Sequence, residues 1–557
     1  MPAVTARLAL TALCLAACAH PAHPEPGAAG GARPAAGEPA DPSGPQPSEA
    51  RPGAPAGHAD PLPAIRADVE GLLRDQAEDL WRAWTTGAPP DQARAWRGRE
   101  RLLARETLAQ VTAARERAGG DERRALSHLR AFLAGERLAH AAAGPAEALA
   151  GAEAEAGFAW EGRRLPLSDL QGLLAGEPDA ARRASIEKAH AAASARLSPL
   201  AEAWTRALDA EARRLGARDL LALAADLRGE PAEALAALAE AVLAATDASW
   251  RGLAADLARR ELGPLPGGPR ERDLPRLERL AHESQAFPAA RLRDDGATAF
   301  RGLGIDLGAL PGLEVDDAPR PGKHPRPLML PVAVPGAIRL SVRPAGGAAE
   351  ARAFLRELGA GVALAHVKSP AVEFRRLGPA WSSGAWGRLS GGLTGHPDWL
   401  AERVGLGNHG LGREVRAAWL ERLHEVRLAA ARLAAEVEAA RSHARGGEIR
   451  ARWLGRALGA PADPAEGERA LRGDPLLRSA EVLRAELLAA QAETFLARRA
   501  GGPAFWRRRE NGEWLRRVWA EGSRQSAAEL AQAMGFPALE PSALASLART
   551  RIEGAAP

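Results

Sequence analysis

A glutamate directly after a histidine opens the His-Glu-x-x-His pattern, in which two imidazoles one helical turn apart bind zinc and the glutamate acts as general base. The chain has this pair at His282-Glu283 and at His424-Glu425. The residues four positions after the two histidines are Ala286 and Leu428, and neither side chain can bind a metal. Neither pair therefore predicts a zinc site.

Nucleophilic and dinucleotide-dependent chemistry have no better candidates. No serine lies in a Gly-x-Ser-x-Gly turn, and the chain has 2 cysteines, Cys14 and Cys18, both close to the N-terminus. The segment Gly405–Gly410 has the spacing of a dinucleotide-binding fingerprint, but no predicted strand precedes it. We expect this segment to be a loop.

Cys18 ends an N-terminal segment that is typical of exported proteins. An apolar run, Leu8–Ala17, follows the single charge of Arg7 and is too short to cross a bilayer. Leu15-Ala16-Ala17-Cys18 resembles the lipobox of bacterial lipoproteins, in which the cysteine is acylated and becomes the new N-terminus. Residues 1–18 are thus predicted to be a lipoprotein signal peptide and Cys18 the membrane attachment. In the alternative, an ordinary signal peptidase cuts nearby and Cys18 is incidental.

The resemblance also predicts a location. Ala19 follows the cysteine where an aspartate would imply retention, so the lipobox implies an outer-membrane anchor with the domain facing the periplasm. Residues 19–62 are rich in Pro, Ala, Gly and Ser and cannot bury enough apolar surface to offset their ordering entropy. We expect them to be a disordered spacer that reaches about 35–40 Å as a coil.

The charge balance excludes a nucleic-acid partner. Lys+Arg number 74 and Asp+Glu 70, so the net charge is only +4 over 557 residues. No later segment is both long and uncharged enough to predict a membrane span.

Residues 63–557 are predicted to form a mainly α-helical domain. Apolar residues recur at helical spacing in Ile65–Trp84, Leu102–Arg117, Ala180–Leu215 and Pro231–Leu262. The exception is Leu328–Val342, where two apolar stretches flank Pro335-Gly336 and predict a β-hairpin. A further helix is expected from about Ala348 to His366. The length favours two lobes with a cleft between them, although one continuous helical superstructure would fit the same pattern.

Several segments of the chain, in their order along the sequence, resemble the thimet oligopeptidase and oligoendopeptidase F family of zinc metallopeptidases. The resemblance spans roughly Trp160 to Leu547 and implies a multi-helical, zincin-like fold with a small hairpin beside the zinc helix. The matching segments are Glu177–Arg183, Arg214–Asp219, Asp317–Pro325, Phe354–Ala360, His396–Leu400 and Trp514–Gly522.

By this resemblance, the catalytic residues of the family are mostly absent. Arg356 and Ala360 stand where the family has its two zinc histidines, and only Glu357, at the general-base position, is kept. The window for the third ligand, Ser383–Trp386, has no carboxylate, and Glu373 lies about ten residues too early. The family also uses a tyrosine to stabilise the oxyanion, whereas this sequence contains no tyrosine. We therefore expect no metal, no cofactor and a remnant, non-functional Glu357.

Four histidines after Glu357 could in principle rebuild a metal site from new positions. We expect them to face solvent or to be capped by hydrogen bonds instead. They are His366, His396, His409 and His424.

The leading hypothesis is a membrane-anchored pseudopeptidase that binds peptides or an envelope protein. In the resembling peptidases, substrate lies along an exposed strand, so we expect binding along the strand 337–342 through its free backbone groups. The residues of this strand are Ala337, Ile338, Arg339, Leu340, Ser341 and Val342. The alternatives are a helical envelope scaffold whose cleft is filled by side chains, and an active zinc peptidase with a relocated metal.

Overall fold

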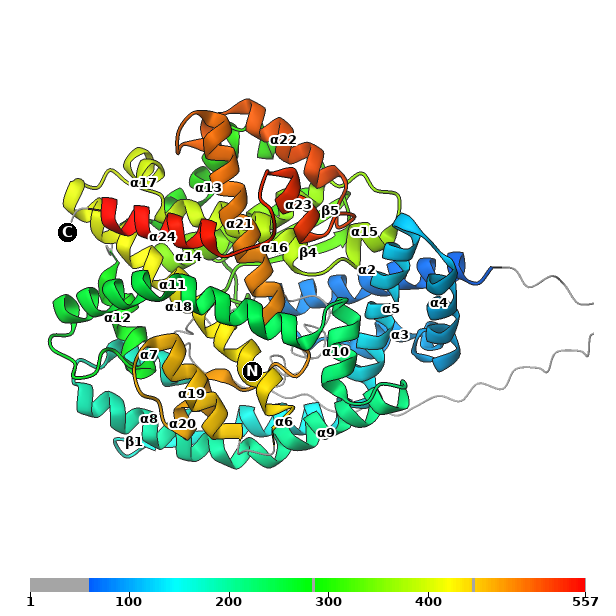
Figure 1. Cartoon of the computed structure of the whole chain (residues 1–557), viewed down its shortest axis with the longest axis horizontal. Helices are drawn as coiled ribbons and strands as arrows, with labels where there is room; N and C mark the ends of the chain where they lie inside the picture. Colours follow the sequence, from blue (N-terminus) through cyan, green and yellow to red (C-terminus); the bar gives the residue numbers. More distant parts are fainter. Residues whose placement is uncertain (1–59, 283–285, 443–445, 556–557) are drawn as a thin grey trace, which may run out of the picture.

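A computed structural model describes residues 60–282, 286–442 and 446–555. The predicted signal peptide, the lipidated Cys18 and nearly all of the 19–62 spacer lie outside the described residues. The first described helix begins at Leu62, the last residue of the predicted spacer. Figure 1 shows the helices packed closely around one another, with the two small sheets set among them.

The helices fall into three runs along the chain. The first run precedes the strands and consists of α2 (Leu62–Thr86), α3 (Gln92–Trp96), α4 (Arg105–Arg117), α5 (Gly120–Ala141) and α6 (Ala143–Glu155). The second run lies between the two sheets and consists of α7 (Leu170–Gly176), α8 (Ala180–Ser194), α9 (Ser198–Arg214), α10 (Leu220–Arg228), α11 (Ala232–Glu261), α12 (Leu274–Ala281) and α13 (Leu292–Arg301). The third run follows the second sheet and consists of α14 (Ala348–Ala365), α15 (Val372–Arg376), α16 (Trp381–Gly391), α17 (Pro397–Arg403), α18 (Asn408–Ala439), α19 (Gly446–Leu458), α20 (Pro464–Leu471), α21 (Ser479–Ala500), α22 (Arg509–Ala520), α23 (Ala527–Ala533) and α24 (Ser542–Gly554).

The predicted mainly helical fold is confirmed, and several helices match the expected stripes closely. The stripe Pro231–Leu262 is α11, and the helix expected from about Ala348 to His366 is α14. The stripe Ala180–Leu215 is two helices, because a short 3-10 turn at Ala195–Leu197 separates α8 from α9.

Side-chain caps explain where some helices begin. The carboxylates of Asp219 and Asp463 accept backbone N–H bonds at the first turns of α10 and α20, and the Ser526 hydroxyl does the same for α23. Such caps satisfy amide donors that have no partner within the helix, and each typically stabilises it by about 1 kcal/mol.

The second sheet has three strands in the order β3 (Leu313–Asp316), β5 (Ala337–Ser341) and β4 (Leu328–Ala333). Antiparallel pairing of β4 with β5 confirms the predicted hairpin. However, β3 pairs in parallel with the other side of β5. The expectation that the strand 337–342 has a free edge is therefore wrong, because β5 is hydrogen-bonded on both sides. A separate two-stranded hairpin joins β1 (Gly157–Trp160) and β2 (Arg163–Pro166).

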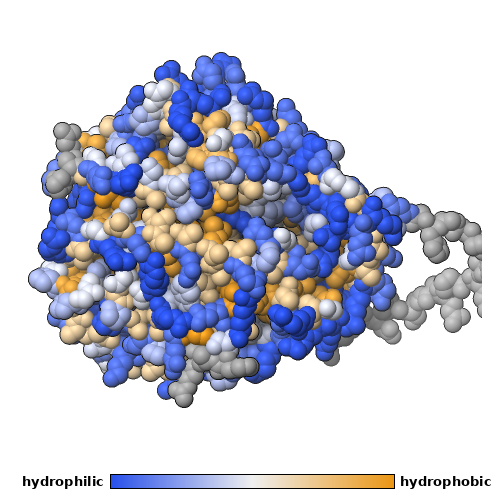
Figure 2. Space-filling model, in the orientation of Figure 1, coloured by the Kyte–Doolittle hydropathy of each residue, from blue (hydrophilic) through white to orange (hydrophobic). Residues whose placement is uncertain are grey.

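Two apolar clusters account for most of the core. The larger joins α10–α14 and α16–α24 to β5, and within it α14 packs against α16 and α11 against α18. The smaller cluster joins α2, α4 and α5 and includes Val69, Leu102 and Leu129. No helix in the described part of the chain is long and apolar enough to cross a membrane. On the face drawn in Figure 2, hydrophilic side chains alternate with apolar patches.

Candidate functional site

The helix α14 carries the residues that the family comparison singles out, and α16 lies tightly against it. Glycine makes this approach possible: a Cβ at Gly387 would come within 2.5 Å of the Arg356 carbonyl oxygen. Glu357 and Ala360 are buried. The positions of a zinc helix and of the third-ligand helix are thus adjacent, as the resemblance implies, and their side chains decide what they can bind.

Arg356 is held by a carboxylate on α18. Its Nη1 and Nη2 donate to Glu425 at 3.1 and 2.9 Å, which is a bidentate ion pair. Arg388 of α16 binds the same carboxylate and donates to Glu486 of α21 at 2.8 Å. A permanently charged guanidinium fixed in this way supplies no lone pair and repels a cation.

The other expected ligand positions have no donor atom for zinc. Ala360 ends at a methyl group, and the window Ser383–Trp386 has no carboxylate. Glu373 is fully buried, and its Oε1 accepts a hydrogen bond from Arg66 Nε of α2 at 2.6 Å. This carboxylate therefore joins the N-terminal helix to α15.

Glu357 faces the sheet, away from Arg356. Its Oε2 accepts a hydrogen bond from the backbone N–H of Met329 on β4 at 2.8 Å. Burial raises the pKa of Glu357 to about 7, against the opposing effects of the Met329 bond and the charges of Arg356 and Arg326. The glutamate that the resemblance places at the general-base position thus ties α14 to a strand.

The outer edge of β4 is covered elsewhere as well. Arg376 Nη1 donates to the carbonyl of Val332 at 2.8 Å. On α2, Trp81 and Trp84 pack with Leu328 and Leu330 of β4 in a small apolar cluster. The indole of Trp84 also donates to the Arg326 carbonyl at 3.1 Å. The Met329 N–H and the Val332 carbonyl on this edge are therefore already hydrogen-bonded within the chain.

The predicted binding strand is mostly inaccessible. Ile338, Leu340 and Val342 are fully buried, and Ser341 is buried as well. Arg339 projects toward α2, where it pairs with Glu78 at 2.6 Å.

The histidines have local roles. His282 lies 2.7 Å from Glu414 and 3.0 Å from Glu421, and His424 lies 2.7 Å from Glu278. The His366 ring contacts the Val362 carbonyl, and His409 is exposed. Burial lowers the pKa of His396 to about 2, and the charge of Arg551 adds to this effect. Within the described ranges, no group of three or more His, Cys, Asp or Glu residues is arranged to hold a metal ion.

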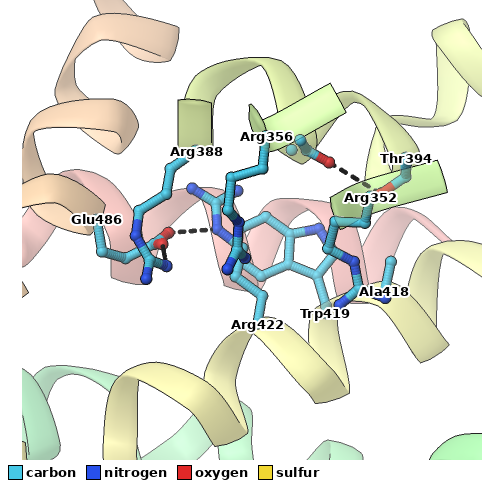
Figure 3. Close-up of a pocket in the computed structure, with 11 residues that line it drawn as sticks. Arg352, Arg356, Arg388, Thr394, Ala418, Trp419, Arg422 and Glu486 are labelled. Atoms are coloured by element: carbon cyan, nitrogen blue, oxygen red, sulfur yellow. Dashed lines mark hydrogen bonds and ion pairs between the residues drawn. The ribbon is translucent and has the colours of Figure 1, made fainter. Parts of the chain in front are cut away.

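Sequence reasoning missed the arginine cluster beside α14. Arg352 and Arg356 lie one turn apart on α14, and Figure 3 shows them with Arg388 and Arg422 around a shared hollow. The sequence does contain a signal, because Glu421 and Glu425 have the same four-residue spacing as the two arginines. The separation of about 69 residues hides the pairing.

A solved structure has a similar arrangement of elements. The M32 carboxypeptidase from Deinococcus radiodurans R1 superposes with a TM-score of 0.57 and 16% sequence identity, over 88% of this chain and 99% of that chain. The chain has a peptidase-like helical fold. No protein-family model and no curated protein matches the sequence. At this identity, the similarity concerns the fold alone. The finer resemblance to the thimet oligopeptidase family and the lipobox stay predictions.

Proposed function

We propose that this chain is a catalytically inactive, metallopeptidase-like scaffold of the bacterial cell envelope, anchored through a lipid on Cys18 and active by binding a protein partner. The observation that carries the proposal is the partly buried ion pair of Arg356 with Glu425 at a position where the resembling family has a zinc histidine.

The chemistry of the site supports the loss of catalysis. A catalytic zinc needs three protein ligands and an open position for water. Here Arg356 brings a positive charge, Ala360 brings a methyl group, and the third-ligand window brings no carboxylate. Glu357 hydrogen-bonds a strand, so it is not available to activate a water molecule. The residues present do not fit a zinc ion.

The covered edge of β4 favours a scaffold over a receptor that binds an extended peptide along this strand. A peptide could add to this sheet only at an edge with free backbone groups. In the sheet, β5 is central, and Glu357, Arg376 and α2 cover the outer edge of β4. A folded partner that contacts the outer surface does not need such an edge.

The location rests on the N-terminal sequence. The predicted lipid on Cys18 and the predicted spacer would hold the helical domain away from an outer membrane, on the periplasmic side. The small net charge of +4 makes nucleic acid an unsuitable partner.

The decisive experiment measures zinc and peptidase activity together. The full chain is purified in detergent from zinc-supplemented medium, its zinc content is determined by mass spectrometry, and cleavage of unfolded peptides is followed with and without a chelator. We expect less than stoichiometric zinc and no chelator-sensitive cleavage. Stoichiometric zinc with cleavage that Glu357→Gln abolishes, and that the exposed control Glu510→Gln keeps, would refute the proposal.

A further inference from the structure

Four arginines surround a hollow between α14, α16 and α18 (Figure 3). Arg352 and Arg356 come from α14, Arg388 from α16 and Arg422 from α18, while Glu486 of α21 is a carboxylate that lines it. The cavity volume is about 20 Å³, and the hollow is partly open to solvent. Four cationic side chains in the wall repel a metal ion and attract an anion.

Carboxylates form ion pairs with these arginines. Glu425 lies between Arg356 and Arg388, and Glu486 lies between Arg388 and Arg422, with Arg422 Nε 2.5 Å from Glu486 Oε1. Of these two carboxylates, only Glu486 also lines the hollow. The ion pairs fix the guanidinium groups in place, so their positions do not depend on a ligand.

Arg352, the fourth arginine of the wall, is also paired with a carboxylate. It forms an ion pair with Glu421, a carboxylate that also contacts His282 Nε2 at 3.0 Å. Burial lowers the pKa of Arg352 to about 10, and the neighbouring charge of Arg356 adds to this effect. Each guanidinium group of the wall is thus paired with a carboxylate, and these ion pairs offset much of the positive charge.

Donors and space remain in the hollow. The Nε atoms of Arg352 and Arg356 are buried and have no hydrogen-bond acceptor among the described residues. Gly391, Gly392 and Gly395 form part of the wall and have no side chain to fill it. The Trp419 ring lies 4.6 Å from the Arg422 guanidinium and supports it by a cation–π contact.

We propose that this hollow binds a small oxyanion with phosphate chemistry. Guanidinium groups bind phosphate oxygens through strong, charge-assisted and often bidentate hydrogen bonds. An anion between Arg352, Arg356 and Arg422 would accept hydrogen bonds from the unpaired Nε donors of Arg352 and Arg356. The assignment does not depend on the lipid anchor or on the absence of peptidase activity.

Calorimetric titration of the full chain in detergent tests the proposal. Inorganic phosphate and glycerol phosphate are titrated separately at constant ionic strength, with chloride as the control ion. We expect one site per chain for phosphate and none for chloride. Tighter binding of glycerol phosphate would support a phosphate ester as the ligand, and equal or weaker binding would support the free ion.

Gly392→Asp provides an internal competitor for the anion. Gly392 has φ −63°, which any residue adopts, and a Cβ there would lie 3.5 Å from Arg422 Nη1. The new carboxylate should weaken phosphate binding about tenfold or more, because it satisfies the same donors. The matched control Gly252→Asp adds the same charge on the exposed side of α11 and should bind as the native chain does.

The outcomes separate the hollow from a surface effect. No phosphate binding by the native chain, unchanged binding by Gly392→Asp, or equal weakening by Gly252→Asp would overturn the proposal. If circular dichroism shows that Gly392→Asp is unfolded, Arg352→Met replaces it, since Glu421 keeps His282 as a partner. That variant should also weaken phosphate binding about tenfold, and native-like affinity would overturn the proposal.

Discussion

Glu357 accepts a hydrogen bond from the backbone N–H of Met329 at 2.8 Å, so the glutamate that the resemblance places at the general-base position covers part of a strand edge. The bond joins α14 to β4 on the side of the strand that faces away from β5. The protonation of Glu357 should therefore contribute to the pH dependence of the free energy of unfolding.

The pKa of Glu357 is raised by burial to about 7, from 4.5 for an exposed glutamate. A group with a raised pKa in the folded state contributes stability that is fully present below pH 4.5 and is lost as pH rises to about 7. Relative to Glu357→Gln, which keeps an acceptor for Met329, the native chain should lose up to about 3 kcal/mol over this range. Urea unfolding of both proteins at pH 4.5 and pH 8 measures the difference. The exposed Glu510→Gln should track the native chain, and a constant gap between native and Glu357→Gln would contradict the prediction.

Restoring two histidines should not restore a zinc enzyme. The double variant Arg356→His and Ala360→His supplies two imidazoles but no third ligand, because the 383–386 window has no carboxylate. The variant also removes the ion pair of Arg356 with Glu425, while the ion pair of Arg388 with Glu425 is kept. We expect at most weak zinc binding in a competition assay with a chromophoric chelator, and no peptide cleavage. Tight, stoichiometric zinc binding would show that a residue elsewhere in the chain supplies the third ligand.

Arg66 should be essential for docking α2. Its partner Glu373 is fully buried, so Arg66→Met leaves a carboxylate without its guanidinium. Removing one member of a buried pair typically costs about 3–5 kcal/mol, and partial exposure of Arg66 places the effect toward the lower end. The double variant with Glu373→Gln should recover much of the lost stability in urea unfolding. If the single variant is as stable as the native chain, the ion pair does not hold α2 in place.

The contact of α14 with α16 should tolerate no side chain at Gly387. A methyl group there meets the backbone oxygen of Arg356, and two helices must separate to admit it. Gly387→Ala should lower the free energy of unfolding by about 1–3 kcal/mol. Gly172→Ala, on the exposed side of α7 with nothing near its Cβ position, is the matched control and should be neutral or slightly stabilising. Equal stability of the two variants would argue against tight helix packing.

The anchor prediction concerns Cys18. If this thiol carries the lipid, Cys18→Ala should move the protein from the membrane fraction into a soluble or uncleaved form. Each acyl methylene buried in the membrane contributes about 0.8 kcal/mol, and no helix of the described chain could replace that attachment. Cysteine to serine at Cys14, which lies within the predicted signal peptide, is the control. Unchanged membrane association of Cys18→Ala after a salt wash would refute lipidation.

Local patterns predicted much of the fold. The periodicity of α11 and α14 and the Pro335-Gly336 turn depend on neighbours within a few residues, so they can be recognised along the chain. The β1–β2 hairpin has an equally local signal in Glu161-Gly162, where both residues have positive φ, but it was missed.

The errors concern partners distant in sequence. The four-residue strand β3 has no pattern of its own, and its parallel pairing with β5 depends on the surrounding tertiary structure. Without β3, the strand 337–341 looks like an edge. The partners of Arg356 and Arg388 lie on α18 and α21, and no local rule connects those helices to α14.

The docking of α2 against β4 also determines when the chain can finish folding. The bond from Trp84 to Arg326 joins residues 242 positions apart, so α2 can dock only after a strand that is synthesised much later. Such distant pairing slows folding and leaves apolar surface exposed in the meantime. A chain interrupted before Leu328 would display Trp81 and Trp84 to solvent, because their apolar partners on β4 would be missing.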